Sequence, residues 1–246
     1  MSDSQNWPHV GLFLKQTYEG GYRYLDHCGE LMVELESDLA FFPTEGVRPT
    51  GCKMFKPEQG LEVSVNSNEL TIRQEGGEIS IDEFSELAAD VSKRVISKFE
   101  PTRIVSNGTA LHLFRRYTSE ESSLSAIKTH WGKYEETLSD KIGMICVTKG
   151  LDFTFSSGSY RLLTKVNPAS IRRNPVPLEA AHFGDSSLKK EQIRRRNLAG
   201  ERFPREMGYG LLCDLDLIED TPPLDGLIKQ FKELKRLKAA ILELLP

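Results

Sequence analysis

Hydrophobic and polar residues alternate over residues 61–65 and 70–72, which predicts two β-strands joined by an asparagine-rich turn. Ser80 and Glu83 follow with the spacing of a capping box, in which each side chain satisfies a backbone donor at a helix start. Apolar residues then recur every three or four positions. The pattern therefore predicts a hairpin followed by a helix over residues 80–98.

Asn107 and Gly108 predict a second hairpin, because this pair tolerates positive φ at both centres of a type I′ turn. Its strands would be residues 103–105 and 110–114, which are rich in apolar side chains. Residues 22–39 have helical spacing, which favours a helix, although Leu31, Val33 and Leu35 also alternate with acidic residues as in a strand. The next segments predict a helix from the 119–123 region to 138 and a meander of strands at 144–147, 153–155 and 160–163. The last part predicts an irregular excursion over 167–206 with one helix at 188–198, a closing strand at 210–217, and a terminal amphipathic helix.

Hairpins predominate over long crossovers in this order of elements, so the sheet should be mainly antiparallel. The predicted fold class is α+β: a mainly antiparallel sheet with hairpins and a meander, packed by about four helices including the C-terminal one. The 246 residues suit a single globular unit, with two intimately packed halves as a variant. Those halves would be residues 1–140, with helices and hairpins, and 141–246, with the meander, the excursion and the terminal helix.

The composition and the motifs of the chain exclude several classes of protein. The first residues lack the basic and long apolar regions of a secretory signal, and no apolar run reaches the length of a membrane span, so we expect a cytoplasmic protein. The four cysteines form no C-x-x-C motif and are expected to be buried free thiols. Glycine-rich phosphate loops, the G-x-S-x-G elbow and paired-histidine metal motifs are also missing. We expect no cofactor.

The net charge of −4 conceals an uneven distribution. Residues 1–100 carry 18 acidic and 9 basic residues, whereas residues 151–210 carry 11 basic and 6 acidic residues. Arginine can neutralise phosphates and stack on bases, so the basic segment is a candidate contact for a partner or a nucleic acid. The acidic net charge instead favours docking on an acidic protein surface. The candidate contact residues are Arg172, Arg173, Lys189, Lys190, Arg194, Arg195, Arg196, Arg202 and Arg205.

Asp214 and Asp216 are two positions apart in a predicted strand, so their side chains share one face and could hold a divalent cation. A metal site would need further oxygen ligands, for which Asp152 and Glu219 are only guesses. A solvated polar strand face explains the pair better, because antiparallel strands commonly alternate in this way. His112 lies in a predicted strand without a sequence-adjacent partner, which favours a packed or hydrogen-bonded role over catalysis.

The order of elements resembles a sporadically distributed bacterial family of uncharacterised proteins of similar length. The resemblance rests on the strand pair at 61–74, the helix start at 79–84, the strand end at 113–117, and the closing strand and helix at 211–245. It implies an α+β fold, a distribution typical of mobile or antiviral-defence genes, and no catalytic residues.

These observations predict a non-catalytic binding or scaffolding component of a cytoplasmic assembly. Its partner would be a second copy of itself or the product of a neighbouring gene, with no membrane partner. The alternative is a nucleic-acid-binding protein or a metal-dependent nuclease that uses the basic segment at 172–205 with Asp214 and Asp216.

Overall fold

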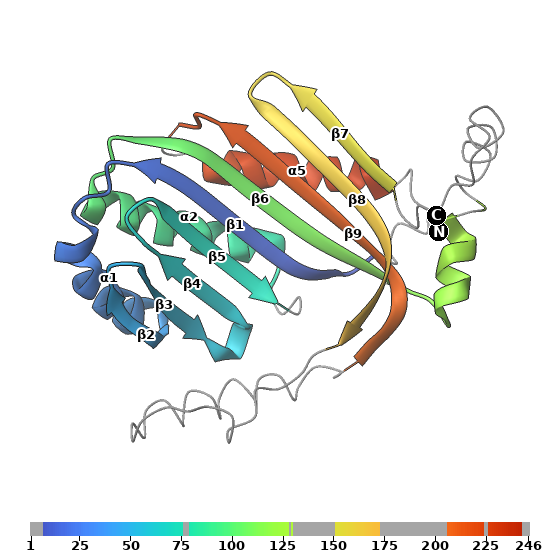
Figure 1. Cartoon of the computed structure of the whole chain (residues 1–246), viewed down its shortest axis with the longest axis horizontal. Coiled ribbons are helices and arrows are strands. Elements are labelled where there is room, and N and C mark those ends of the chain that lie inside the picture. Colours follow the sequence, from blue (N-terminus) through green and yellow to red (C-terminus); the bar gives the residue numbers. More distant parts are fainter. Residues whose placement is uncertain are drawn as a thin grey trace.

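A computed structural model describes residues 7–75, 79–127, 129, 151–172, 206–223 and 226–242. Its centre is a nine-stranded sheet with the order β2-β3-β4-β5-β1-β6-β9-β8-β7, in which every adjacent pair is antiparallel (Figure 1). The α+β class is therefore confirmed. The strands are β1 (His9–Glu19), β2 (Phe42–Arg48), β3 (Gly51–Lys56), β4 (Leu61–Val65), β5 (Glu69–Glu75), β6 (Arg103–Arg116), β7 (Leu151–Ser157), β8 (Tyr160–Arg172) and β9 (Glu206–Asp220).

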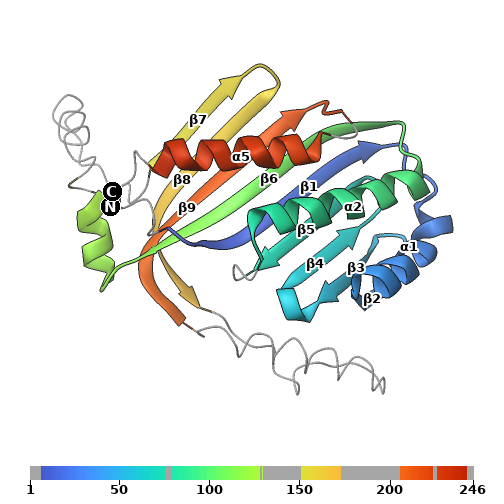
Figure 2. The same cartoon turned by 180° about the vertical axis from the view of Figure 1, so that it is seen from behind.

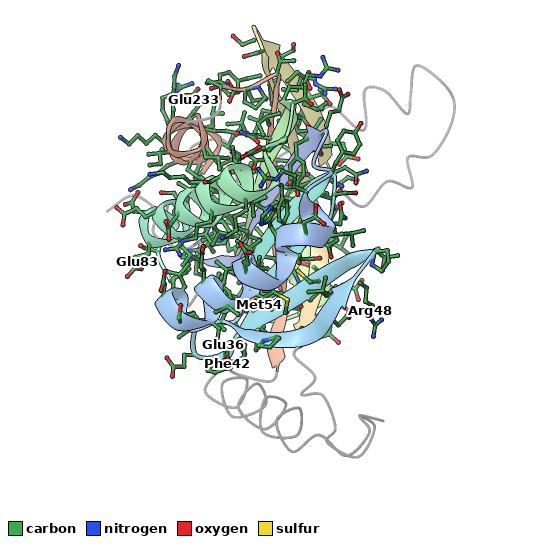
Figure 3. All side chains as sticks on the ribbon, turned by 90° about the vertical axis from the view of Figure 1, so that its left-hand side faces the viewer. Glu36, Phe42, Arg48, Met54, Glu83 and Glu233 are labelled. Carbon is green, nitrogen blue, oxygen red and sulfur yellow. The ribbon has the colours of Figure 1, made fainter. Side chains whose placement is uncertain are left out.

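Three long helices cover one face of this sheet. Figures 1 and 2, seen from opposite sides, place all three on the same side of the strands, and the end-on view of Figure 3 shows Glu83 and Glu233 within this helix layer. The opposite side, which we call the open face, carries no described helix. The helices are α1 (Tyr24–Leu39), α2 (Ile81–Phe99) and α5 (Leu227–Leu242), with a 3-10 turn at Pro57–Gln59 and a further helix at residues 120–127.

The chain follows the same order of elements twice. β1, α1, a meander of strands and α2 make the first pass, and β6, the helix at 120–127, a second meander and α5 make the second. In each pass the last strand of the meander returns beside the first strand, β5 beside β1 and β9 beside β6. The passes meet where β1 and β6 pair antiparallel, so one sheet joins them.

Alternation along the strands determines which side chains form the core. Leu12 and Leu14 of β1 are buried under the helices, and so are Leu215 and Leu217 of β9. The alternating residues Phe13 and Asp216 face the open side instead. Ser80 caps α2 through the predicted capping box with Glu83, since both reciprocal hydrogen bonds are present. The sequence patterns for the 61–75 hairpin, α1, α2 and α5 are thus confirmed.

The hairpin predicted at Asn107 and Gly108 is wrong, because β6 runs without interruption through both residues. Asn107 is fully buried, and its side-chain oxygen accepts a hydrogen bond of 3.0 Å from Gln16 Nε2. Its backbone oxygen accepts a second bond of 2.9 Å from Gln230 Nε2 of α5. Pairing with β1 and β9 on both sides outweighs the local turn preference of the Asn-Gly pair.

Other boundaries also differ from the sequence pattern. β8 and β9 extend well into the predicted excursion, where Pro168 pairs with Leu211, and strands β2 and β3 were not predicted. Strands β7 and β8 confirm that part of the meander. The strand predicted at 144–147 and the helix predicted at 188–198 lie outside the described residues.

Candidate functional site

Three polar side chains gather at the middle of the open face. Asp214 and Asp216 alternate along β9 with the buried Leu215 and Leu217, so both carboxylates project from the same side, away from the helices. In the sheet register, Asp214 lies directly opposite His112 of β6. The carboxylate pair noted in the sequence is therefore joined by a histidine that lies about a hundred residues earlier.

His112 and Asp214 form the shortest contact of this cluster, with Nδ1 of the imidazole 2.5 Å from Oδ1 of the carboxylate. An imidazole held through Nδ1 by a carboxylate can exchange a proton through Nε2, which is the geometry of a general base. Lys165 of β8 lies opposite Asp214 on its other side. The sequence could not indicate this pairing, because it depends on the register between β6 and β9.

The pKa values of the cluster follow from these neighbours. The hydrogen bond to Asp214 is the main cause that raises the pKa of His112, and the charge of Asp216 adds to it. Burial raises the pKa of Asp216, which the positive charges of His112 and Lys165 partly oppose. We expect the charged imidazolium form of His112 to be favoured over a wider pH range than in a free histidine.

Replacing His112 with glutamine should lower stability only in acidic solution. A raised folded-state pKa stabilises the fold fully below the ordinary histidine value, and this stabilisation is lost as pH rises through the folded value. Since the His112 side chain is 39% exposed, we expect a difference of about 1 kcal/mol. Urea unfolding of both proteins between pH 5 and pH 9 measures it, and an equal difference across that range would contradict the pairing.

Glu219 and Asp152, the two further ligands suggested for a metal site, do not lie beside Asp214 and Asp216. Glu219 is buried on the helix side of β9, whereas Asp214 and Asp216 face the open side. Asp152 lies 4.0 Å from Lys165 Nζ, at the outer strand β7. In the described ranges, no group of three histidine, cysteine, aspartate or glutamate side chains could hold a metal ion.

The rest of the open face carries cross-strand ion pairs. In each pair an acidic side chain lies beside a basic one and offsets its charge. Each pair links neighbouring strands or their ends and lies in contact with solvent. The pairs, with the distance from side-chain nitrogen to carboxylate oxygen, are Lys15–Glu69 at 2.7 Å, Arg73–Glu62 at 3.0 Å and Lys53–Glu45 at 3.6 Å.

The predicted basic contact lies mostly outside the described residues. Of its nine residues, Arg172 alone falls within them, at the end of β8 opposite Glu206. The other eight (Arg173, Lys189, Lys190, Arg194, Arg195, Arg196, Arg202 and Arg205) do not. Near this end of the sheet, a pocket of about 630 Å³ is lined by Arg116, Tyr117, Thr118, Ser122, Gly208 and Tyr209.

The two edges of the sheet differ in regularity. β2 contains Pro43, and its register with β3 is irregular at two places. β7 pairs with β8 over seven consecutive residues without irregularity and contains no proline. Phe153 and Phe155 of β7 stack with their ring centroids 6.2 Å apart, and Phe155 is 48% exposed. β2 thus has features that discourage further strand pairing, and β7 lacks them.

Comparison with known proteins adds no assignment: no family model and no curated protein matches the chain. None of the helices in the described residues combines the length and the apolar character needed to cross a membrane. The resemblance to a bacterial family stays a prediction.

Proposed function

We propose that this protein is a non-catalytic binding or scaffolding component that assembles with a second copy of itself through the edge strand β7. The observation that carries the proposal is the regular, proline-free edge of β7, where Phe155 is exposed and stacks on the half-buried Phe153. An edge strand presents a row of backbone donors and acceptors that another strand can pair with. No described strand occupies this side of β7.

The sequence of β7 is self-complementary about Thr154. If two copies pair antiparallel with Thr154 on the two-fold axis, Phe153 of each copy lies opposite Phe155 of the other. Asp152 then faces Ser156 of the second copy, so the two acidic side chains do not oppose each other. Cross-strand aromatic pairs each contribute about 0.2 to 1 kcal/mol, and two such pairs form across the axis.

A binding role also accounts for the open face better than catalysis does. His112 and Asp214 provide a proton-exchanging pair, but they line neither the pocket of about 630 Å³ near Tyr117 nor the smaller pocket beside Asn66 in the described part of the chain. The surrounding ion pairs satisfy the charged groups within the protein. These features suit a solvated sheet surface.

Replacing Thr154 with lysine should dissociate the assembly. The substitution puts two ammonium groups beside each other at the axis, which costs about 2 to 3 kcal/mol and weakens association by about 30-fold to 150-fold. Thr154 is exposed, so the fold of each copy should be retained. Size-exclusion chromatography with light scattering over a dilution series measures the change in mass.

The control is Thr44→Lys, the same substitution on the opposite edge strand β2, where the half-buried Thr44 donates a hydrogen bond of 3.3 Å to the Lys53 backbone oxygen. We expect this variant to associate like the wild type. A wild-type protein that stays monomeric at every concentration would contradict the proposal, and so would dissociation by Thr44→Lys but not by Thr154→Lys.

The nucleic-acid alternative depends on the basic segment and stays a prediction. Neutralising Arg194, Arg195 and Arg196 would then weaken binding to single-stranded DNA and reduce its salt dependence by about one unit of slope for each lost phosphate contact. Fluorescence anisotropy at several salt concentrations distinguishes this activity from self-association, because the Thr154→Lys variant should bind DNA like the wild type.

A further inference from the structure

Two cysteines from different elements lie in contact inside the first half of the chain. Cys28 of α1 and Cys52 of β3 have their Sγ atoms 2.9 Å apart, and both side chains are buried. Cys28 belongs to the face of α1 that is buried against the sheet, together with Tyr24 and Leu31. Cys52 points from β3 toward the same helix layer as Met54.

We propose that Cys28 and Cys52 are a modification site that forms a reversible intramolecular disulfide when a peroxide oxidises it. This inference is independent of the proposed self-association. Neither residue is in the open-face cluster or in β7. The proximity of the two sulfur atoms carries the inference, since a disulfide requires side chains that already approach each other.

The reaction needs one peroxide for each pair of thiols. The Cys28 thiolate attacks a peroxide oxygen, the O–O bond breaks, and the sulfur becomes a sulfenic acid while the released hydroxide takes up a proton to form water. The Cys52 sulfur then attacks the sulfenic sulfur, an S–S bond forms, the S–O bond breaks, and a second water leaves with the Cys52 proton. Two thiols are oxidised and one peroxide is reduced to two waters.

The opposite pKa shifts of the two thiols indicate that Cys28 reacts first. Its hydrogen bond with Cys52 lowers the pKa of the Cys28 thiol, and the same contact raises that of Cys52. Burial raises the pKa of the third described cysteine, Cys213 on β9, to about 12, so this thiol should be unreactive. Cys28 should therefore attack the peroxide and Cys52 should resolve the sulfenic acid.

The disulfide would tie α1 to the strand β3 next to the sheet edge. It closes a loop of about 25 residues, which restricts the unfolded chain and should raise the melting temperature by about 5 to 10 °C. Dithiothreitol should return the melting temperature to its original value.

Differential alkylation of the full chain tests the proposal. The protein is treated with hydrogen peroxide and then denatured, its free thiols are blocked with light iodoacetamide, and newly reduced thiols are labelled with heavy iodoacetamide. We expect the heavy label on Cys28 and Cys52 alone, in a protein that has lost two hydrogen atoms and remains a single chain on a non-reducing gel. Heavy label on another pair, or on none, would overturn the proposal.

Two variants assign the individual steps. Cys52→Ser should accumulate a sulfenic acid at residue 28 that dimedone captures, and Cys28→Ser should give no dimedone adduct at residue 52. Cys213→Ser is the control and should form the disulfide at the wild-type rate. Dimedone capture at residue 52 in Cys28→Ser, with none at residue 28 in Cys52→Ser, would overturn the order of attack.

Discussion

Replacing Phe231 with alanine lowers the free energy of unfolding by about 3 to 5 kcal/mol. The Phe231 side chain is 2% exposed, and its ring packs edge-on against Phe84 of α2 with centroids 5.5 Å apart. Alanine would leave a cavity between α5 and α2 that the rigid helix layer cannot close. Urea denaturation followed by circular dichroism measures the loss. Ile228→Ala on the exposed side of α5 is the control and should change the value by less than about 0.5 kcal/mol.

The Phe231→Ala variant also distinguishes packing of α5 on the sheet of its own chain from packing of α5 against a second chain. In the structure α5 packs on the sheet of its own chain, and Gln230 donates hydrogen bonds of 2.9 Å to the backbone oxygens of Asn107 and Leu217. If α5 were instead an intermolecular element, Phe231→Ala would stay folded and become a smaller species in light scattering. That outcome would contradict the intramolecular packing.

Replacing Asn107 with aspartate should destabilise the protein by about 3 to 5 kcal/mol at pH 8, because it buries an uncompensated charge. Asn107 is fully buried and lies opposite Glu219, whose side chain is also buried. Burial would raise the pKa of the new carboxyl, so the penalty is present above that pKa and is lost as pH falls through it. Urea denaturation at pH 8 and pH 5 should therefore give a smaller difference from the wild type at pH 5.

Asn68→Asp provides the control, because Asn68 is exposed in the turn between β4 and β5. This variant should differ from the wild type by less than about 0.5 kcal/mol at both pH values. Equal, small effects at residues 107 and 68 would show that Asn107 lies in an exposed turn, as the Asn-Gly pair predicts, and would contradict the continuous strand β6.

Local signals in the sequence were sufficient where one element determines its own boundaries. The capping box of Ser80 and Glu83 and the apolar stripe to Phe99 predicted α2 to within one residue at each end. The alternation over 61–75 predicted both strands of the hairpin. These patterns depend on hydrogen bonds and burial within a short stretch, so they can be interpreted without knowledge of the rest of the fold.

Features that depend on distant partners could not be predicted in this way. The Asn-Gly pair at 107–108 has the local preference of a turn, but its neighbours β1 and β9 come from segments about a hundred residues away in the chain. The contact between His112 and Asp214 depends on the same β6–β9 register, and the contact between Cys28 and Cys52 depends on how α1 packs over β3. A single sequence contains no direct signal for these pairings.

The association of two copies through β7 is tested most directly by a charge-swap experiment at Thr154. Thr154→Lys and Thr154→Glu should each be monomeric alone, because like charges meet at the two-fold axis. An equimolar mixture should form a heterodimer, since the ammonium and carboxylate groups then lie opposite each other. With the Thr154→Glu variant uniformly labelled with ¹⁵N, native mass spectrometry of the mixture distinguishes the two homodimers from the heterodimer by mass. A mixture that remains monomeric, or single variants that still dimerise, would contradict pairing of β7 about Thr154.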